Sequence, residues 1–489
     1  MPTPARNRDH LTRPTLVVIC LCVLVAQSMV AAINLMIPQL AASTLAPTSG
    51  QLLWAVDAYV IAFAGLLIPA GACGDRYGRR RALLAGLALF ALGAAVSALA
   101  GDPAVLIAGR AASGAGAALI MPATMAILVQ LAGPEGRVQA LASWTLALGL
   151  GGLAGNLGGG LVAQYLPWQA LFWLMPPIAA VLVLAVLRTV PALPGQPAAA
   201  PDPIGAVLLT AGVTVLLHGV IESPAHGWTS AGVLSALALG ALLLAGFTRH
   251  ALRSAHPLVD PRLFAARRLR AAVLGSATSF FGLFALFYVN SQYLQYVKGY
   301  SAVLTGVAIV PLTVGMALVP RIAVRLQARS GPRPLIGGGL ALIGAGLLAA
   351  STADAATPYP LYAVWLLVIS VGMGLSAPAL AFGVVSELPP GQAGLGSGLN
   401  TAARELGAAT GVAVVGTVLT GRFAGRPADL IGAAGGSRVA EYAAASGAGL
   451  RVVGVLVLVA AATVWFGLRG GPAELPGTPA PEPARKTLV

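Results

Sequence analysis

Long apolar runs, each separated from the next by a short polar connection, recur along almost the whole chain. A helix needs roughly 20 mainly apolar residues to cross a bilayer. By that criterion the chain holds about 14 such runs, near residues 15–38, 51–72, 82–100, 104–130, 138–163, 168–189, 204–221, 230–248, 270–296, 302–324, 334–351, 359–382, 396–420 and 449–468. The pattern predicts an all-α integral membrane protein with about 14 transmembrane helices.

Composition supports this class, because 57% of the 489 residues are hydrophobic and 9% are charged. That apolar content exceeds what a water-soluble core of this length needs. The formal net charge of +14 comes mainly from arginines that lie in every second connection between the runs and do not form one patch. We therefore read the charge as a signal of membrane topology, with the lipid bilayer and not a nucleic acid as the partner.

The basic residues fall on one side of the predicted bundle. They are Arg6, Arg8, Arg13, Arg76, Arg79, Arg80, Arg81, Arg249, Arg253, Arg262, Arg267, Arg268, Arg270, Arg321, Arg325, Arg329, Arg333, Arg485 and Lys486. The positive-inside rule places that side, and both termini, in the cytoplasm of a cell whose plasma membrane holds the protein. The connection at 421–448 is the exception, since its three arginines fall on the predicted outer face.

The chain repeats itself internally. GACGDRYGRRRALLAG at 71–86 resembles AVRLQARSGPRPLIGG at 323–338, and matching Gly78 with Gly331 also brings Arg80 to Arg333. Repeated halves are the usual build of secondary transporters. We therefore expect two six-helix bundles with an extra central helix pair; the predicted units are an N-terminal bundle at 1–190, a linker with the extra pair at 191–268, a C-terminal bundle at 269–468 and a disordered cytoplasmic tail at 469–489.

Signals of enzymatic, nucleotide or metal chemistry are absent from the sequence. Lys298 and Lys486 do not sit in a GxxxxGK phosphate loop, and the five histidines include no HExxH pair. We expect no cofactor, no metal and no enzyme activity. Any transport has to use a gradient, and a membrane enzyme remains the least favoured class.

Three segments carry a family resemblance. They are GACGDRYGRRR at 71–81, LIAGRAASGAGAAL at 106–119 and GLGGLAGNLGGGL at 149–161. Together with the ninth and thirteenth runs they resemble the major facilitator superfamily over residues 15–470, and within it the 14-span drug:proton antiporter branch that includes multidrug and antibiotic-resistance exporters. The resemblance implies the major facilitator fold and alternating access.

The first segment resembles the signature loop of that superfamily and is expected to act as a gate latch. Its glycines permit a tight turn and close helix approach, while the carboxylate can cap and pair across the bundle interface. A plain cluster of topology-setting charges is the alternative. The gating residues are Gly71, Gly74, Asp75, Arg76, Gly78, Arg79 and Arg80.

The other two segments suggest coupling and sealing. Arg110 lies about seven residues into its run, some 10 Å deep at 1.5 Å per residue. We interpret it as a charge of a proton relay or of the substrate site, with one half of a structural ion pair as the alternative. The glycine-rich fifth run resembles a motif of antiporters, and its small residues are expected to let the two halves approach closely, with ordinary packing as the alternative. Its residues are Gly149, Gly155, Asn156, Gly159 and Gly160, with Asn156 where the family usually has proline.

Aromatic and amide side chains at helical spacing in the ninth run suit a cavity for planar, weakly polar compounds, although packing is an equally good reading. The cavity candidates are Asn34, Phe284, Tyr288, Gln292, Tyr293, Gln295 and Arg404. Glu405 is either a second membrane carboxylate or a residue near the interface.

Asp57 is a carboxylate inside the second apolar run. The family's first helix usually bears an acid where this chain has Met29. Asp57 and Arg110 enter from the same side to nearly the same depth, so Asp57 is hypothesised to replace that acid by exchanging between water and Arg110. A fixed Asp57–Arg110 bridge and direct binding of a cationic substrate by Asp57 are the alternatives.

The leading interpretation is a monomeric, proton-coupled exporter of small hydrophobic or cationic organic compounds, either drugs or endogenous metabolites. Its partners are the small-molecule substrate and protons. A facilitator or importer on the same fold is the closest rival, because the usual acid is missing and Asn156 departs from the antiporter motif.

Overall fold

The computed structural model describes residues 11–41, 43–47, 49–193, 202–388, 393–423 and 436–469. Regular structure in this part of the chain is helical. The elements are α1 (Arg13–Ala41), α2 (Ser49–Tyr77), α3 (Arg79–Ala98), α4 (Pro103–Leu131), α5 (Gly133–Tyr165), α6 (Gln169–Trp173), α7 (Met175–Thr189), α8 (Pro203–His226), α9 (Ala231–Arg253), η1 (Pro261–Ala265), α10 (Arg267–Gln292), η2 (Tyr293–Val297), α11 (Ala302–Ala308), α12 (Val310–Ser330), α13 (Pro332–Ala350), α14 (Tyr359–Ser386), α15 (Ala393–Arg422) and α16 (Ser437–Gly467).

The described residues contain 14 segments long and apolar enough to span a membrane, which confirms the predicted number. Three spans are built from two consecutive elements: α6 with α7, α10 with η2, and α11 with α12. Proline near the start of α7 and of α12 explains two of these breaks, because proline has no N–H to donate to the preceding helical turn.

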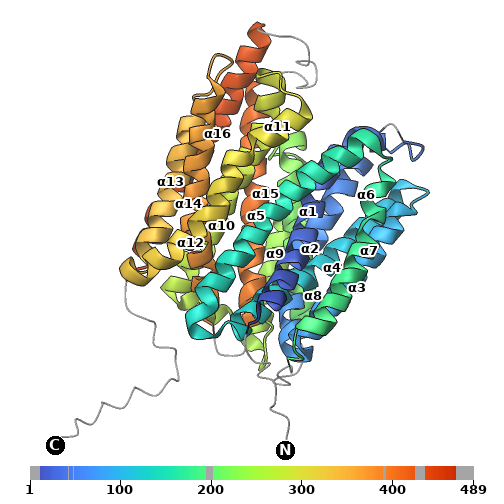
Figure 1. The fold of residues 1–489 in the computed structure, drawn as a ribbon, viewed down its shortest axis with the longest axis vertical. Coiled ribbons are helices and arrows are strands. Elements are labelled where there is room, and N and C mark those ends of the chain that lie inside the picture. Colours follow the sequence, from blue (N-terminus) through green and yellow to red (C-terminus); the bar gives the residue numbers. More distant parts are fainter. Residues whose placement is uncertain are drawn as a thin grey trace, which may run out of the picture.

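Figure 1 shows the blue-to-cyan helices of the first half beside the yellow-to-red helices of the second half. We call α1–α7 the first half and α10–α16 the second half. The extra pair, α8 and α9, pack together, and α8 also contacts α2 and α15, so it touches both halves. The proposed limits of these units at 1–190, 191–268 and 269–468 remain a prediction, and residues 194–201 of the linker and 470–489 of the tail lie outside the described residues.

The internal repeat is visible in backbone geometry. Gly78 separates α2 from α3 with φ 101°, and Gly331 separates α12 from α13 with φ 75°. Arg80 Nη2 donates to the carbonyl of Leu187 in α7 at 2.7 Å, and Arg333 Nε donates to the carbonyl of Trp465 in α16 at 3.1 Å. Matched residues thus make matched contacts with the last helix of each half, as duplication predicts.

The end of the bundle that holds the α2–α3 and α12–α13 turns is called the arginine-rich end here. Successive spans alternate in direction, so these turns, which follow the second and the tenth span, share one end. The sequence predicts that this end is cytoplasmic.

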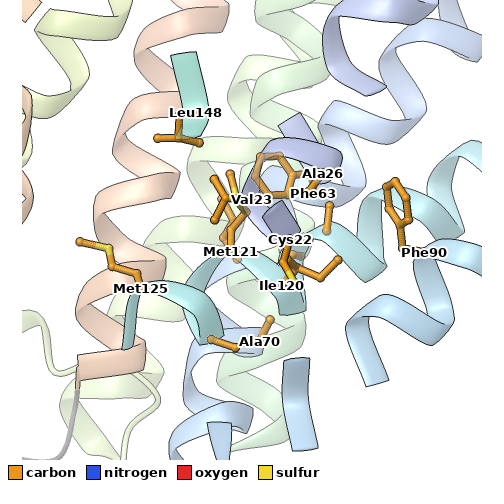
Figure 2. Close-up of a cluster of buried hydrophobic side chains, with 14 of the residues drawn as sticks. Cys22, Val23, Ala26, Phe63, Ala70, Phe90, Ile120, Met121, Met125 and Leu148 are labelled. Atoms are coloured by element: carbon orange, nitrogen blue, oxygen red, sulfur yellow. The ribbon is translucent and has the colours of Figure 1, made fainter. Parts of the chain in front are cut away.

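The core of the first half is built around α4, which packs against α1, α2, α3 and α5. Figure 2 shows side chains of Cys22, Phe63, Phe90, Met121 and Leu148, one from each of these helices, gathered in one cluster. Glycines allow α3 and α4 to approach closely: a Cβ on Gly116 would lie 2.7 Å from the carbonyl oxygen of Gly86. Tight packing of this kind holds membrane helices together where lipid offers no hydrophobic drive.

Two helices extend beyond their predicted ends. α2 continues to Tyr77, so most of the signature segment is helical and a single glycine, Gly78, makes the turn. α16 begins at Ser437, well before the predicted start at 449, because its alanine- and glycine-rich first turns contain no helix breaker and pack inward through Tyr442 and Ala445. Of the exceptional connection at 421–448, residues 424–435 lie outside the described residues.

Candidate functional site

A narrow cavity lies where the two halves meet. Helix α5 of the first half contributes one wall, and α10, α14 and α15 of the second half contribute the rest. The lining residues are Trp144, Thr145, Leu148, Ser276, Ser279, Phe280, Ala377, Leu380, Ala381, Asn400 and Arg404. The lining is largely apolar with a few polar groups, which is the usual make-up of a small-molecule site.

Arg404 is the charged residue of this cavity, and 4% of its surface is exposed. Its guanidinium carbon lies 3.9 Å from the ring centre of Phe280 and 5.3 Å from that of Trp144. The Trp144 ring is fixed by its own Nε1–H, which donates to the hydroxyl of Thr124 at 3.2 Å. Aromatic faces at these distances attract a cation, so both rings stabilise Arg404 in the membrane interior.

Arg110 on α4 is fully buried and is held by backbone groups of α2. Its Nε donates to the carbonyl of Ala55 at 2.9 Å, its Nη2 donates to that of Val56 at 3.3 Å, and its guanidinium carbon lies 4.6 Å from the ring centre of Tyr59. The hydroxyl of Tyr59 in turn donates to the carbonyl of Ala26 on α1. Arg110 therefore ties α4 to the turn of α2 that carries Asp57.

Asp57 is half-buried, and in the described part of the chain it has neither an ion pair nor a hydrogen bond to Arg110. The two groups still act on each other electrostatically. A fixed Asp57–Arg110 bridge is thus not formed in this conformation. Arg110 binds the α2 backbone beside the acid and leaves the carboxylate free to meet other groups.

Glu222 on α8 is a second acid within electrostatic range of Asp57. It pairs with the ring of His226 at 2.9 Å, and one turn earlier on the same helix His218 stacks on Trp54 of α2 with ring centres 5.3 Å apart. Our sequence reasoning did not select Glu222. The available signal was an acid inside an otherwise apolar span of the extra helix pair.

Glu405 follows Arg404 on α15 and is 7% exposed. Residues adjacent on a helix point about 100° apart, and the described residues show no ion pair between the two. Glu405 acts electrostatically on Arg404, which lines the cavity, and on Tyr59 of α2. Glu405 therefore belongs to the interface between the halves and is not a residue near the membrane surface.

Asp75 connects the two halves at the arginine-rich end. One carboxylate oxygen, Oδ2, accepts a hydrogen bond from the backbone N–H of Leu395, at the start of α15, at 3.0 Å. The other, Oδ1, lies 3.0 Å from Arg79 Nη2 and 3.1 Å from Arg79 Nε. A carboxylate at a helix N-terminus satisfies free N–H groups and meets the positive end of the helix dipole.

The arginines of the predicted latch make contacts within the first half. Arg79 also donates to the side-chain oxygen of Gln130 on α4 at 2.6 Å, and Arg76 lies over the ring of Tyr77. Gly71 and Gly74 are buried in the last turns of α2. The structure thus brings Asp75 to the second half, whereas Arg76, Arg79 and Arg80 contact the half they belong to.

The glycine-rich helix α5 packs in two directions. Gly155 lies against the carbonyl of Ser28, and a Cβ on Gly159 would lie 2.9 Å from Cα of Ala32, both on α1 of the same half. Gly149 instead faces the second half, where a Cβ on Gly149 would lie 3.4 Å from Cε of Met316. The expected close approach between the halves therefore holds for Gly149 but not for Gly155 and Gly159, because the small face of α5 is filled by α1. Asn156 and Gly160 are half-buried on the same helix.

Most of the predicted aromatic cavity residues pack within the second half. Phe284 stacks on Phe280, Tyr293 donates to the carbonyl of Asp354 at 2.8 Å, and Gln292 donates to the carbonyl of Tyr288 at 2.8 Å. Gln295 lies in the η2 turn. Of the predicted set, Arg404 lines the cavity found here, and the side chain of Asn34 lies outside the described residues.

The sequence reasoning missed Trp144, Ser276 and Asn400, which do line the cavity. Ser276 donates to Asn400 Oδ1 at 2.8 Å, joining α10 to α15. Polar residues in apolar spans were the available signal for these positions. Within the described residues, no group of three or more histidine, cysteine or acidic side chains is placed to hold a metal ion.

Comparison with curated proteins finds relatives along most of the chain. The chain is 36% identical over 79% of its length to the cephamycin export protein CmcT of Amycolatopsis lactamdurans, of which 80% is covered. It is 31% identical over 86% of its length to the tetracenomycin C resistance and export protein of Streptomyces glaucescens, of which 78% is covered. It is also 34% identical over 77% of its length to the puromycin resistance protein pur8 of Streptomyces alboniger, of which 76% is covered.

Solved structures share the fold. The human organic anion transporter MFSD10 superposes with a TM-score of 0.65 at 19% identity, covering 92% of this chain and 99% of that one. The proton:xylose symporter XylE superposes with a TM-score of 0.60 at 17% identity, covering 93% of this chain and 95% of that one. The profile described as Major Facilitator Superfamily matches residues 19–412. The chain therefore belongs to the Major Facilitator Superfamily, and within it to the branch of antibiotic and multidrug resistance exporters, which are transporters and not enzymes.

Proposed function

We propose that this protein is a proton-coupled exporter of small organic compounds that works by alternating access. Export is supported by the relatives, which are named as cephamycin and tetracenomycin C export proteins. Chains that share about a third of their residues over most of their length keep the same fold, and the cavity between the halves is the feature that fold uses for small molecules. The proposed substrates are hydrophobic organic compounds. Cationic organic compounds are the alternative, because the acids at the interface could bind a positive charge.

The observation that carries proton coupling is the pair of acids at the interface, Asp57 on α2 and Glu405 on α15. Neither forms an ion pair in the described part of the chain. Acidic groups inside a membrane protein are costly and typically mark a proton or ion pathway. Because neither acid is held in an ion pair, each can hold a proton in one state of the cycle and release it in another.

Our proposal gives the charged groups separate tasks. Arg110 binds the backbone of α2 next to Asp57 and so sets the position of that acid. Glu405 shares α15 with Arg404, so proton uptake on one face of the helix and substrate binding on the other are mechanically linked. Asp75 holds the start of α15 in this conformation. Release of that contact would allow the arginine-rich end to open.

A facilitator or importer without proton antiport is the second candidate function. Met29, buried at 1% exposure, occupies the place of the usual first-helix acid. A carrier that had lost its coupling acid would still bind substrate and alternate between two states. In our proposal Asp57 is the proton-binding acid in place of the missing one.

Location and assembly complete the proposal. The 14 candidate spans make this a multi-pass membrane protein. The arginine pattern supports the plasma membrane with both termini in the cytoplasm, and we propose that the monomer is the working unit, with the substrate, protons and lipid as its partners.

The test is uptake of a panel of fluorescent organic compounds into inverted vesicles that carry an inside-acid pH gradient. Wild type is expected to accumulate substrate and to dissipate the gradient. Asp57→Asn and Glu405→Gln are each expected to reduce gradient-driven uptake by roughly tenfold or more, and Glu441→Gln, an exposed carboxylate on α16, serves as the matched control. Uptake that is identical with and without the gradient would establish the facilitator instead.

A further inference from the structure

Arg404 lacks a counter-charge in its own cavity. Its surface is 4% exposed, and in the described chain it makes no hydrogen bond and no ion pair; Nε is buried without a partner. None of the lining residues is acidic. A buried cation without a partner is strongly unfavourable, so the site has an unmet need for an anion.

Two aromatic rings lie beside the guanidinium of Arg404, and its N–H groups make no hydrogen bond within the described chain. Phe280 and Trp144 lie against it with ring centres 3.9 Å and 5.3 Å from the guanidinium carbon. A contact between the guanidinium and a ring face does not use the N–H donors, which point outward in the guanidinium plane. Those donors match the two oxygens of a carboxylate or sulfonate.

The other polar groups of the cavity also favour an acceptor. Asn400 accepts from Ser276 through Oδ1 at 2.8 Å, which leaves its amide N–H donors for another partner. The hydroxyls of Ser279 and Thr145 already donate to backbone carbonyls of their own helices. The unused hydrogen-bonding capacity of the cavity therefore consists mainly of donors, on Arg404 and Asn400.

Glu405 does not neutralise this site. It lies about 100° around the helix from Arg404. It acts electrostatically on Arg404 as well as on Tyr59 of the first half, but it forms no ion pair with Arg404 in the described chain. An acid placed on the other face of α15 lowers the overall charge of the helix but offers no oxygen to the donors inside the cavity.

We propose that the cavity binds the anionic group of an aromatic organic acid, with Arg404 as the counter-charge, Asn400 as a second donor, and Phe280 and Trp144 as stacking walls. The proposal rests on the proposed export function and narrows its substrate class from hydrophobic or cationic compounds to hydrophobic anions.

The test is binding of three ring-matched probes to the purified full-length protein in detergent, measured by isothermal titration: naphthalene-2-carboxylate, naphthalene-2-carboxamide and 2-naphthylmethylammonium. Wild type is expected to bind the carboxylate at least about tenfold more tightly than the amide, since one charge-assisted hydrogen bond contributes that much, and to bind the ammonium weakest. Arg404→Gln is expected to abolish the preference. Arg404→Lys keeps the charge without the planar fork and should retain part of it.

The control is Arg451→Gln, which removes one positive charge from exposed surface of α16 in the same half and should keep the preference. Size-exclusion profiles and melting temperatures establish that each variant is folded, and Phe280→Leu, which weakens stacking without touching the charge, provides an independent readout by lowering affinity for all three probes. Equal binding of carboxylate and amide by wild type, or an unchanged preference in folded Arg404→Gln, would overturn the proposal.

Failure of this inference and failure of the export function give different results. If gradient-driven uptake of neutral or cationic compounds persists while the carboxylate preference is absent, the anion site is wrong and the exporter stands. If no compound of any charge shows gradient-driven uptake, the exporter itself is wrong.

Discussion

Replacing Asp75 with alanine should open the arginine-rich end of the protein. The carboxylate accepts the backbone N–H of Leu395 at 3.0 Å, and this is a hydrogen bond between the two halves. A hydrogen bond to a charged group contributes about 1.5–3 kcal/mol. The contact with Arg79 lies within one half, so its loss is not expected to favour either state. Asp75→Ala should therefore shift the closed-to-open equilibrium toward the open state by roughly 10- to 100-fold.

Spin-label distances across the arginine-rich end measure this shift. Arg81 on α3 and Ala328 on α12 are exposed and belong to different halves, so labels at Arg81→Cys and Ala328→Cys, in a background without the native cysteines, report the opening. Asp75→Ala should move the main distance population to longer values. Asp75→Asn retains an acceptor oxygen and should produce a smaller shift, because a neutral hydrogen bond contributes about 0.5–1.5 kcal/mol.

Asp102→Ala is the matched control. Asp102 caps α4 through the N–H groups of Ala104 and Val105 at 2.8 Å and 3.0 Å, at the opposite end and within one half. Its loss weakens a helix terminus without removing a contact between halves, so the distances should stay as in wild type. Identical distance distributions for wild type and Asp75→Ala would refute the reasoning that this carboxylate latches the two halves.

Three further predictions concern stability in detergent. Gly155→Ala places a methyl group against the Ser28 carbonyl and should destabilise the protein by about 1–3 kcal/mol through overpacking, which lowers the melting temperature. In the control Gly158→Ala the new methyl group meets nothing within 4 Å, so the melting temperature should not fall. Equal effects of the two variants would contradict the α1–α5 contact. Gly331→Ala forces a residue with a Cβ into φ 75° and should cost about 1–2 kcal/mol, and a melting temperature equal to that of wild type would contradict this. Burial raises the pKa of Asp202, but the N–H of Gly205, the ring of His250 and the N–H of Leu258 together hold that pKa below its usual range. The ionised carboxylate therefore stabilises the fold fully above the usual aspartate pKa of about 3.9, and this stabilisation is lost as the pH falls through the lowered pKa. The melting temperature of Asp202→Asn should thus decline less steeply with acid than that of wild type.

Hydropathy predicted the fold because the bilayer imposes it. Every backbone polar group must be satisfied inside the membrane, so long apolar runs can only be helices, and their number follows from counting. The repeat could also be predicted, because Gly78 and Gly331 each form a turn between two helices at φ values that are unfavourable for other residues. Helix ends were less accessible, as α16 shows, since an alanine-rich start lacks the apolar signal of a span.

The candidate site was only partly predictable. Arg404, Asp57 and Glu405 stand out as charges in apolar runs, which is a strong signal because such charges are rare. Asn400, an uncharged polar residue in an apolar span, gave a weaker signal. The role of Trp144 depends on which faces of α5 and α15 meet, which the sequence does not show. An aromatic stripe such as the one around Tyr293 has the same pattern whether it lines a cavity or packs within one half, and sequence spacing alone does not separate the two.

Proton coupling is the central claim, and proton movement driven by substrate tests it most directly. The purified protein would be reconstituted into liposomes that hold a pH-sensitive dye, and a gradient of a transported compound would be imposed with no initial pH difference. The account predicts that substrate flowing in one direction drives protons in the other, that the internal pH changes accordingly, and that Asp57→Asn abolishes this change. Substrate flux in wild type with no change of internal pH would contradict the claim and identify the protein as a facilitator.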